Sequence, residues 1–309
     1  KVMLNTLFVN KFRHGYVRVK GAVMPDYFKK FGDRIQQMDI RDDDVFVYMY
    51  IMYFSGTTWT QEMVWCIAND LDYKGAEVFL PERFPFLDHS ALFNYEAMYE
   101  EQPDFSVPDY VTDSVKYISE LNTRRFIKSH LPLGLLPEKL QNFSTRIIYV
   151  CRNPKDTCVS YYHHCQLLEG YTGDFDTFCK LFSNDMLCFS PFWEHVLEFW
   201  AQRNNPDVLF LRYEDMKKVR SILLKSFSEE EVARLAQHLS FESMKANRAV
   251  NYEPVVEINK KYNLIEKDGT FMRSGSVGGW KNMMTPQTID QFDAWSDAKV
   301  KGSGFKLVC

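Results

Sequence analysis

The sequence predicts an α/β fold with a central parallel sheet and helices on both of its faces. Short apolar runs alternate with longer helical stretches along the chain, and four of these runs predict strands at 45–54, 125–128, 146–150 and 208–211. Continuous apolar runs separated by helices are typical of parallel strands buried on both faces. We expect residues 1–309 to form one domain, and we expect the N-terminus to be truncated because the chain begins at Lys1 rather than Met.

The helical stretches follow the strands. Helices are predicted at 58–69, 154–168, 175–186, 191–203 and 228–238. The last of them begins with Ser228 and three glutamates, which cap a helix and place acids at its positive end. In sheets of this kind ligands bind beyond the carboxyl ends of the strands, so the polar residues that follow each strand are the candidates for function.

Composition excludes several classes of protein. The formal net charge of -4 provides no global basic field for a nucleic acid or an anionic membrane. The longest apolar run, 45–54, is about half of a membrane span. The seven cysteines form no CxxC pair and predict reduced thiols in a cytoplasmic protein. Cys151, Cys158 and Cys165 recur every seven residues, but they are divided between a predicted strand and a predicted helix, so we expect no metal site.

The first strand leads into a Gly-containing loop and then a helix, at residues 53–59. Such a loop aims backbone N–H groups and a helix N-terminus at one point, which suits a phosphate. The alternative is an ordinary strand-to-helix turn capped by threonine. The segment is not a Walker A loop, because no Gly-Lys-Ser/Thr follows a first glycine at the required spacing.

Polar groups also follow the other three predicted strands. Lys128 and His130 follow the second strand, Arg152 and then Ser160 follow the third, and Tyr213 follows the fourth. A Gly-rich basic segment lies further on, at 273–282. Each group also has a structural interpretation: a hydrogen-bonded loop histidine for His130, a pair with Asp156 for Arg152, and core packing for the aromatic residues.

Taken in order, these segments resemble the cytosolic sulfotransferases, which transfer a sulfonate from 3′-phosphoadenosine 5′-phosphosulfate (PAPS) to a hydroxyl or amine. The family pattern has a Tyr-Pro-Lys-Ser-Gly-Thr-Thr-Trp loop, Lys-Thr-His-Leu-Pro, Cys-Arg-Asn-Pro-Lys-Asp, Val-Ser-Tyr-Tyr-His, Tyr-Glu-Asp-Met and Arg-Lys-Gly-x-x-Gly-Asp-Trp-Lys-Asn. The corresponding segments here are 53–59, 128–132, 151–156, 159–163, 213–216 and 273–282. The resemblance covers nearly the whole chain and is closer to insect-type members, near the retinol dehydratase branch.

The resemblance implies a role for each candidate residue. His130 would be the general base, and Lys128 would position or neutralise the sulfonate. Binding of PAPS, and of its product adenosine 3′,5′-bisphosphate, would involve a further set of residues. The 5′-phosphosulfate would be held by Ser55, Gly56, Thr57 and Thr58, the adenine by Trp59 and Tyr213, and the 3′-phosphate by Arg152, Ser160, Arg273 and Gly275.

The chain departs from the family pattern at several positions. Phe54 stands where the family has the loop lysine, which neutralises the bridging oxygen as its bond to sulfur breaks. Ser274 and Gly279 replace a lysine and an aspartate in the C-terminal segment. The strand before the loop is about two residues longer than the family spacing, and the segment after Met216 is about ten residues shorter.

Three functions are consistent with these residues. The first is a sulfotransferase that acts on a small lipophilic hydroxyl compound of the phenol, steroid or retinoid type. The second is a catalytically impaired relative that binds a nucleotide or a lipophilic ligand, because Phe54 replaces the lysine. The third is a P-loop nucleotide kinase, which the missing Walker lysine disfavours. Five aromatic residues are expected near His130, either as walls of an acceptor pocket or as core: Phe84, Phe86, Phe93, Tyr95 and Tyr99.

The resemblance also bears on self-association. The family's dimer motif is Lys-x-x-x-Thr-Val-x-x-x-Glu, and the matching residues here are Lys281, Thr285, Pro286 and Asp290. Proline has no backbone N–H to donate. We therefore expect a monomer or a weak homodimer.

Overall fold

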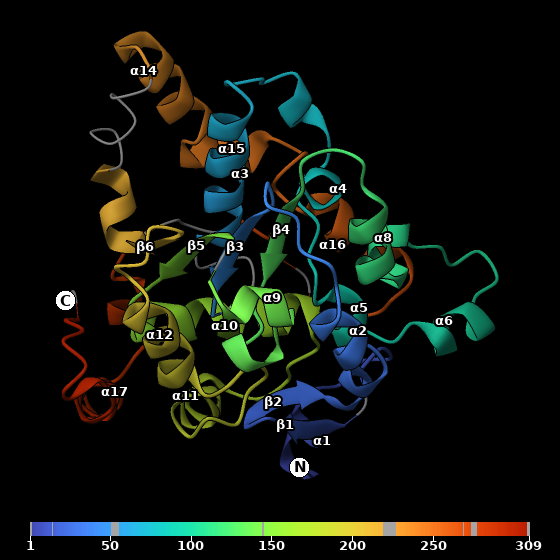
Figure 1. Cartoon of the computed structure of the whole chain (residues 1–309). Helices are drawn as coiled ribbons and strands as arrows, with labels where there is room; N and C mark the ends of the chain where they lie inside the picture. The colour runs from blue at the N-terminus through green and yellow to red at the C-terminus, as the bar shows by residue number, and fades with distance from the viewer. Residues whose placement is uncertain are drawn as a thin grey trace.

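The computed structural model describes residues 2–13, 15–50, 56–143, 145–218, 227–267, 269–272 and 277–307. Its centre is a four-stranded parallel sheet with the strand order β4-β3-β5-β6 (Figure 1). The strands are β3 (Val45–Met49), β4 (Phe126–Ser129), β5 (Arg146–Cys151) and β6 (Val208–Arg212). The predicted parallel α/β fold is therefore confirmed.

Strand β3 is shorter than the sequence predicted. All of its residues are buried, as a continuous apolar run requires. Tyr48 pairs with Ser129, the last residue of β4, so β4 offers no further partner in the ladder. Tyr50 already lies in a bend, and the prediction of a strand there is wrong. Its aromatic side chain is buried against Phe182 and Phe192 rather than in the sheet, and an apolar run alone cannot distinguish these two kinds of burial.

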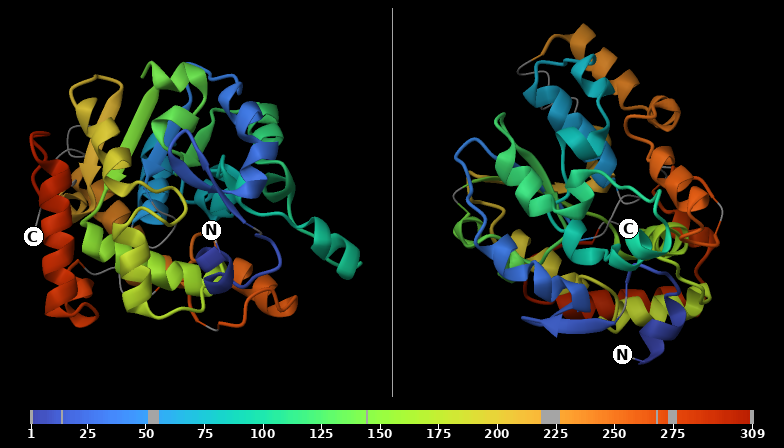
Figure 2. Two further views of the ribbon diagram at one scale, coloured as in Figure 1. Left: turned by 90° about the horizontal axis from the view of Figure 1, so that it is seen from below. Right: turned by 90° about the vertical axis from the view of Figure 1, so that its right-hand side faces the viewer.

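Helices cover both faces of the sheet (Figures 1 and 2). Alternate side chains of β3 enter two separate apolar clusters, with Phe46 and Tyr48 in one and Val45, Val47 and Met49 in the other. The first cluster contains side chains of α10 (Pro154–Leu168), α11 (Phe175–Ser183), α12 (Phe192–Ala201) and α17 (Pro286–Val300). The second contains side chains of α3 (Thr57–Ala68), α14 (Glu229–His238), α15 (Phe241–Ala246) and α16 (Glu253–Lys261).

The predicted helices correspond to α3, α10, α11, α12 and α14. Helix α14 begins as its sequence indicates, because the Ser228 hydroxyl accepts from the N–H of Glu231 and the Glu231 carboxylate accepts from the N–H of Ser228. The sequence did not predict the hairpin of β1 (Tyr16–Val19) and β2 (Ala22–Pro25), the C-terminal helices α15, α16 and α17, or the shorter helices in the first half of the chain. These helices are α1 (Val2–Leu7), α2 (Gly32–Gln36), α4 (Leu80–Arg83), α5 (His89–Leu92), α6 (Glu96–Glu101), α7 (Asp109–Thr112), α8 (Ser114–Glu120) and α9 (Glu138–Gln141).

Short 3₁₀ turns connect several elements: η1 (Asp26–Lys30), η2 (Gly75–Glu77), η3 (Leu133–Leu135), η4 (Tyr213–Lys218) and η5 (Gly279–Asn282). Helix α6 projects from the edge of the molecule, away from the sheet, in both Figure 1 and the left view of Figure 2. Within the described ranges, no helix has both the length and the apolar character needed to cross a membrane.

The order of the strands determines where a ligand site can form. Strand β3 lies between β4 and β5, so the chain leaves it in one direction to reach β4 and returns past it to form β5. In parallel sheets the crevice for a ligand opens at such a switch point, outside the carboxyl ends of the strands. The predicted site residues follow these same strands.

Candidate active site

The ring of Tyr213 joins two of the predicted binding segments. Tyr213 begins η4 directly after β6, and burial raises the pKa of its hydroxyl. The guanidinium carbon of Arg152, which follows β5, lies 4.4 Å from the centre of this ring. Gly56 approaches the same ring so closely that a Cβ on the glycine would lie 2.2 Å from the ring carbon Cδ2. Gly56 also has a φ of 102°, which favours glycine.

Helix α3 begins at this point, with Gly56 as its N-cap. The Thr57 hydroxyl lies 3.1 Å from the sulfur of Met49, and the Thr58 hydroxyl is buried with no hydrogen-bond partner among the described residues. The Trp59 ring is partly exposed, and its Nε1 donates to the carbonyl of Leu239. The N-terminus of a twelve-residue helix with an available buried hydroxyl is suited to an anion.

The N-terminus of α10 lies against the C-terminal part of the chain. The carboxylate of Asp156 accepts from the N–H of Gly278 at 2.8 Å and from that of Trp280 at 3.3 Å. Ser160 lies in the second turn of the same helix and is 4% exposed. These contacts place residues 277–280 beside the helix that carries Ser160. Ser55, Arg273 and Gly275, together with Phe54 and Ser274, lie outside the described residues.

The short segment that contains Pro85 and Phe86 lies beside β4 and determines the surroundings of Lys128. Phe86 forms a parallel bridge with Lys128, whose N–H donates to the carbonyl of Pro85. The ammonium nitrogen of Lys128 lies 4.5 Å from the centre of the Phe86 ring. Two residues after Phe86, the carboxylate of Asp88 accepts hydrogen bonds from the Ser129 hydroxyl and from the His130 backbone N–H.

Three groups hold His130 in position. Its backbone N–H donates to the carboxylate of Asp88 at 2.7 Å, and its carbonyl accepts from Nε2 of His195 at 3.1 Å. The ring Nδ1 lies 2.6 Å from the carbonyl oxygen of Met49, the last residue of β3. Because a carbonyl only accepts, Nδ1 carries the proton and Nε2 is the acceptor. Within the described residues, this buried Nε2 has no hydrogen-bond partner.

Burial controls the charges in this part of the site. Burial, with the charge of Lys128 and despite the bond to Met49, lowers the pKa of His130 well below its ordinary value. Burial also lowers the pKa of Lys128, which the nearby Asp88 opposes. Burial raises the pKa of Asp88 to about 7, although Ser129 and His130 both donate hydrogen bonds to it. His130 is therefore uncharged near neutral pH and can accept a proton.

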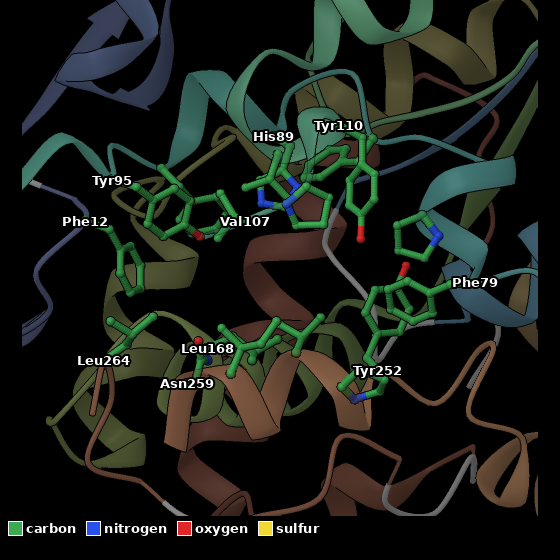
Figure 3. Close-up of a pocket in the computed structure, with 18 of the residues that line it drawn as sticks. Phe12, Phe79, His89, Tyr95, Val107, Tyr110, Leu168, Tyr252, Asn259 and Leu264 are labelled. Atoms are coloured by element: carbon green, nitrogen blue, oxygen red, sulfur yellow. The ribbon is translucent and has the colours of Figure 1, made fainter. Parts of the chain in front are cut away.

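Figure 3 shows an apolar cavity of about 280 Å³. His130 is not among its lining residues, and the connection to this histidine runs through Phe86. Phe86 lines the cavity, and its ring makes an edge contact with that of His130 at a centroid distance of 5.1 Å. Four of the five predicted wall residues line it: Phe84, Phe86, Phe93 and Tyr95. The prediction is wrong for Tyr99, because this residue lies on the projecting helix α6 and is 43% exposed.

Sequence reasoning missed several residues of the site. Asp88 and Met49 reach His130 from other segments, and Met49 does so through its backbone, so no side-chain pattern could identify it. His195 is connected in the same way, because its Nδ1 accepts from the hydroxyl of Tyr149 while Nε2 holds the His130 carbonyl. His89 lines the cavity. Its position between the predicted wall residues Phe86 and Phe93 was the available signal.

One cluster outside the site has groups that bind metals. The ligand atoms of Glu62, Cys66 and His238 lie within 4.8 Å of one another. However, the Glu62 carboxylate already pairs with Arg83 and accepts a hydrogen bond from Nε2 of His238 at 2.6 Å. Burial opposes the charge on Glu62, but His238 and Arg83 outweigh it and lower the pKa of the carboxyl. Because the guanidinium already occupies the carboxylate, this cluster is a buried ion pair.

Comparisons with known proteins agree with this geometry. The Sulfotransferase domain family model matches residues 42–304. The luciferin sulfotransferase of Photinus pyralis is 42% identical over 310 residues, covering 96% of this chain and 83% of the relative. Sulfotransferase 1E1 of Homo sapiens is 32% identical over 305 residues, covering 94% of this chain and 95% of the relative. Crystal structures of retinol dehydratase include a complex with retinol and PAP that has a TM-score of 0.84 at 28% identity, covering 98% of this chain and 94% of that one.

The chain belongs to the sulfotransferase family, and its class of activity is sulfonate transfer to hydroxyl acceptors. The fold is the sulfotransferase fold, and the expected resemblance is confirmed. The bound nucleotide in the retinol dehydratase complexes is PAP, which is adenosine 3′,5′-bisphosphate. The kinase interpretation is therefore set aside.

Proposed function

We propose that this protein transfers the sulfonate of PAPS to the hydroxyl of a small lipophilic acceptor, with His130 as the general base. The observation that carries the proposal is the state of the His130 ring. Its Nδ1 is held by the Met49 carbonyl, its Nε2 is unprotonated, and the ring as a whole contacts a cavity-lining phenylalanine, Phe86. A base must have an available lone pair near the proton that it removes.

The proposed transfer needs one proton acceptor and one anion site. As the acceptor oxygen attacks sulfur, its proton moves to Nε2 of His130. The sulfur–oxygen bond to the nucleotide breaks, and the electron pair leaves with adenosine 3′,5′-bisphosphate. Lys128 is buried, and its ammonium lies over the Phe86 ring that also contacts His130. An arriving sulfonate favours the charged form of such a lysine, so Lys128 would neutralise the group in transit.

The nucleotide would bind across the carboxyl ends of β3, β5 and β6. In this proposal Gly56, Thr57 and Thr58 contact the 5′-phosphosulfate with Ser55, and Arg152 and Ser160 hold the 3′-phosphate with Arg273 and Gly275. Trp59 and Tyr213 contact the adenine. Two observations support this arrangement: the buried Thr58 hydroxyl that has no partner among the described residues, and the contact of Tyr213 with both Gly56 and Arg152.

The acceptor would occupy the apolar cavity. Its volume of about 280 Å³ and its aromatic walls suit a phenol, steroid or retinoid. The related retinol dehydratase has been crystallised with retinol and with androsterone, which are both lipophilic hydroxyl compounds. The proposal therefore includes a lipophilic acceptor and neither a nucleic acid nor a membrane as partner.

One feature of the sequence supports a second candidate function. In this candidate, the protein is a family member that binds both ligands but turns over slowly. Phe54 stands where the resemblance places a cation for the bridging oxygen. Loss of an interaction made mainly in the transition state lowers kcat and leaves ligand affinity intact. Under this candidate, Phe54→Lys raises kcat substantially while donor affinity changes little.

Two further points belong to the proposal. The six cysteines in the described residues are free and buried, which supports a cytoplasmic location. We also propose a monomer or a weak homodimer. In the segment that matches the family's dimer motif, Pro286 is the first residue of α17 and has no backbone N–H to donate to a partner. The side chain of Thr285 accepts a hydrogen bond from the N–H of Thr288 within the same chain.

The test begins with a calorimetric titration of the protein with adenosine 3′,5′-bisphosphate. Turnover is then measured with radiolabelled PAPS over a phenol, a steroid and a retinoid. Binding with turnover supports the transferase, and binding with turnover only after Phe54→Lys supports the second candidate. Failure to bind the bisphosphate would exclude both.

A further inference from the structure

His89 differs from the other residues that surround the acceptor cavity. It begins α5, and its ring lies among the rings of Phe86 and Phe93, at centroid distances of 5.9 and 5.1 Å. Figure 3 draws it on the wall opposite Leu168 and Asn259. Its ring is only partly buried, and it lines the cavity. A polar ring on a largely aromatic wall determines which ligands the cavity accepts.

The imidazole of His89 has unused hydrogen-bonding capacity. Within the residues that the structure describes, neither ring nitrogen makes a hydrogen bond. Burial, with a smaller contribution from the charge of Lys128, lowers the pKa of His89 to about 3. The ring is therefore neutral near pH 7, with one N–H donor and one acceptor nitrogen. An apolar ligand that covered it would leave both groups unsatisfied, which costs binding free energy.

The position of His89 relates it to the reaction centre. The ring of Phe86 contacts the rings of both His89 and His130, at centroid distances of 5.9 and 5.1 Å, and the ammonium of Lys128 lies over the same ring. An aromatic acceptor whose hydroxyl reaches His130 would extend past Phe86, along the wall that carries His89. The hydroxyl of Tyr110 lies on the same wall in Figure 3 and is a competitor for this role.

We propose that His89 is a specificity-determining residue, whose imidazole hydrogen-bonds a second polar group of an aromatic acceptor. The favoured substrates are phenols that carry a ring nitrogen, carbonyl or second hydroxyl in addition to the hydroxyl that receives the sulfonate. A site with a buried hydrogen-bonding group discriminates strongly against an analogue that leaves the group unpaired. This inference rests on the proposed function, because it concerns the acceptor site of the same reaction.

The test compares acceptors of matched shape. 2-Naphthol and 6-hydroxyquinoline have the same size and hydroxyl but differ by one ring nitrogen, and 2,6-dihydroxynaphthalene adds a donor. For each, kcat/KM is measured for the unmodified chain, His89→Phe and His89→Asn. The preference for at least one bifunctional acceptor over 2-naphthol should fall by about tenfold in His89→Phe, as expected for one buried hydrogen bond. His89→Asn should retain part of the preference.

Two controls distinguish the proposed role of His89 from a role of Tyr110 and from direct participation in the reaction. Tyr110→Phe removes a hydroxyl from the same wall and should leave the preference unchanged. Turnover of 2-naphthol should fall less in His89→Phe than turnover of the bifunctional acceptors, because 2-naphthol has no second polar group to pair with the imidazole. An equal or larger loss with 2-naphthol would place His89 on the reacting hydroxyl and overturn the proposal. An unchanged preference in His89→Phe, or a preference lost only in Tyr110→Phe, would also overturn it.

Equilibrium binding separates this inference from the proposed function. The dissociation constants of the three acceptors are measured by calorimetry with the complex of protein and adenosine 3′,5′-bisphosphate. If the chain binds the acceptors but does not turn over PAPS, the proposed function fails and the ratio of dissociation constants still decides the role of His89. If none of the three acceptors binds, the inference about His89 is wrong.

Discussion

The ring of Tyr213 lies against Gly56 so closely that a methyl group on the glycine would be 2.2 Å from ring carbon Cδ2. Tyr213 follows β6, and Gly56 begins the helix that follows β3. The contact therefore joins the ends of two strands that are not neighbours in the sheet. The shape of the proposed binding site for the 5′-phosphosulfate therefore depends on the position of the Tyr213 ring.

We predict that Gly56→Ala destabilises the protein and weakens binding of adenosine 3′,5′-bisphosphate. The left-handed backbone costs about 1–3 kcal/mol for a residue other than glycine, and the collision with Tyr213 adds to this. Gly302→Ala is the matched control, because Gly302 has a φ of 81° and open space around it. Urea unfolding should show a larger loss for Gly56→Ala. Equal losses would contradict the role of the Tyr213 contact.

We predict that Arg152→Ala weakens binding of adenosine 3′,5′-bisphosphate on the order of ten- to hundredfold, since charge-assisted hydrogen bonds to phosphate are lost. Binding of AMP, which lacks the 3′-phosphate, should change much less. Arg203→Ala is the control, because Arg203 also lies over an aromatic ring, at 4.3 Å from the centre of Trp200, but on the exposed surface. Calorimetry that gave the same loss for both nucleotides would remove Arg152 from the 3′-phosphate site.

We predict that His130→Ala lowers kcat by about a hundredfold or more, the usual contribution of a general base. The affinity for adenosine 3′,5′-bisphosphate should remain nearly unchanged. The melting temperature should fall only by what the ring packing and the Nδ1 bond to the Met49 carbonyl contribute, because Nε2 makes no hydrogen bond to the described residues. His195→Gln is a useful comparison, since its amide can still donate to the His130 carbonyl. A large fall in melting temperature with retained turnover would support a structural role for His130.

We predict that Asp88→Asn becomes more stable relative to the unmodified chain as the pH rises. Burial raises the folded-state pKa of Asp88 from 3.8 to about 7. The stability that the protonated carboxyl contributes is fully present below 3.8 and is lost as the pH rises through 7, whereas asparagine does not titrate. Each unit of pKa corresponds to roughly 1.4 kcal/mol, so the difference should reach a few kcal/mol.

Urea unfolding at pH 5 and pH 8 measures this difference. The side chain of asparagine can still accept from the His130 N–H and donate to the Ser129 hydroxyl, so the variant should fold. Asp88→Ala removes both contacts and should lower kcat as well. A stability difference between Asp88→Asn and the unmodified chain that did not change with pH would show that Asp88 titrates normally.

The sequence was sufficient to predict the central sheet, because the strands of this sheet are short apolar runs that end in polar residues. It placed His130 directly after β4 and Arg152 directly after β5, as the structure has them, whereas Lys128 lies within β4 rather than after it. It did not show what holds His130, because the Met49 carbonyl and the Asp88 carboxylate come from segments that are distant in sequence. Tyr99 was assigned to the wrong surface, since aromatic composition does not reveal that α6 projects outward.

The cavity walls and the nucleotide contacts come from different parts of the chain. The cavity is lined by Phe12, Leu168 and residues within 79–111 and 252–264, and it includes none of Gly56, Thr58, Arg152, Ser160 or Tyr213. Substitutions in the walls can therefore accumulate without altering the residues proposed for the shared donor. Over evolutionary time, the enzymes of one lineage can come to modify different compounds while all of them use the same cosubstrate. For the same reason, the segments that form the cavity walls are suitable units to exchange when chimaeras are made between relatives.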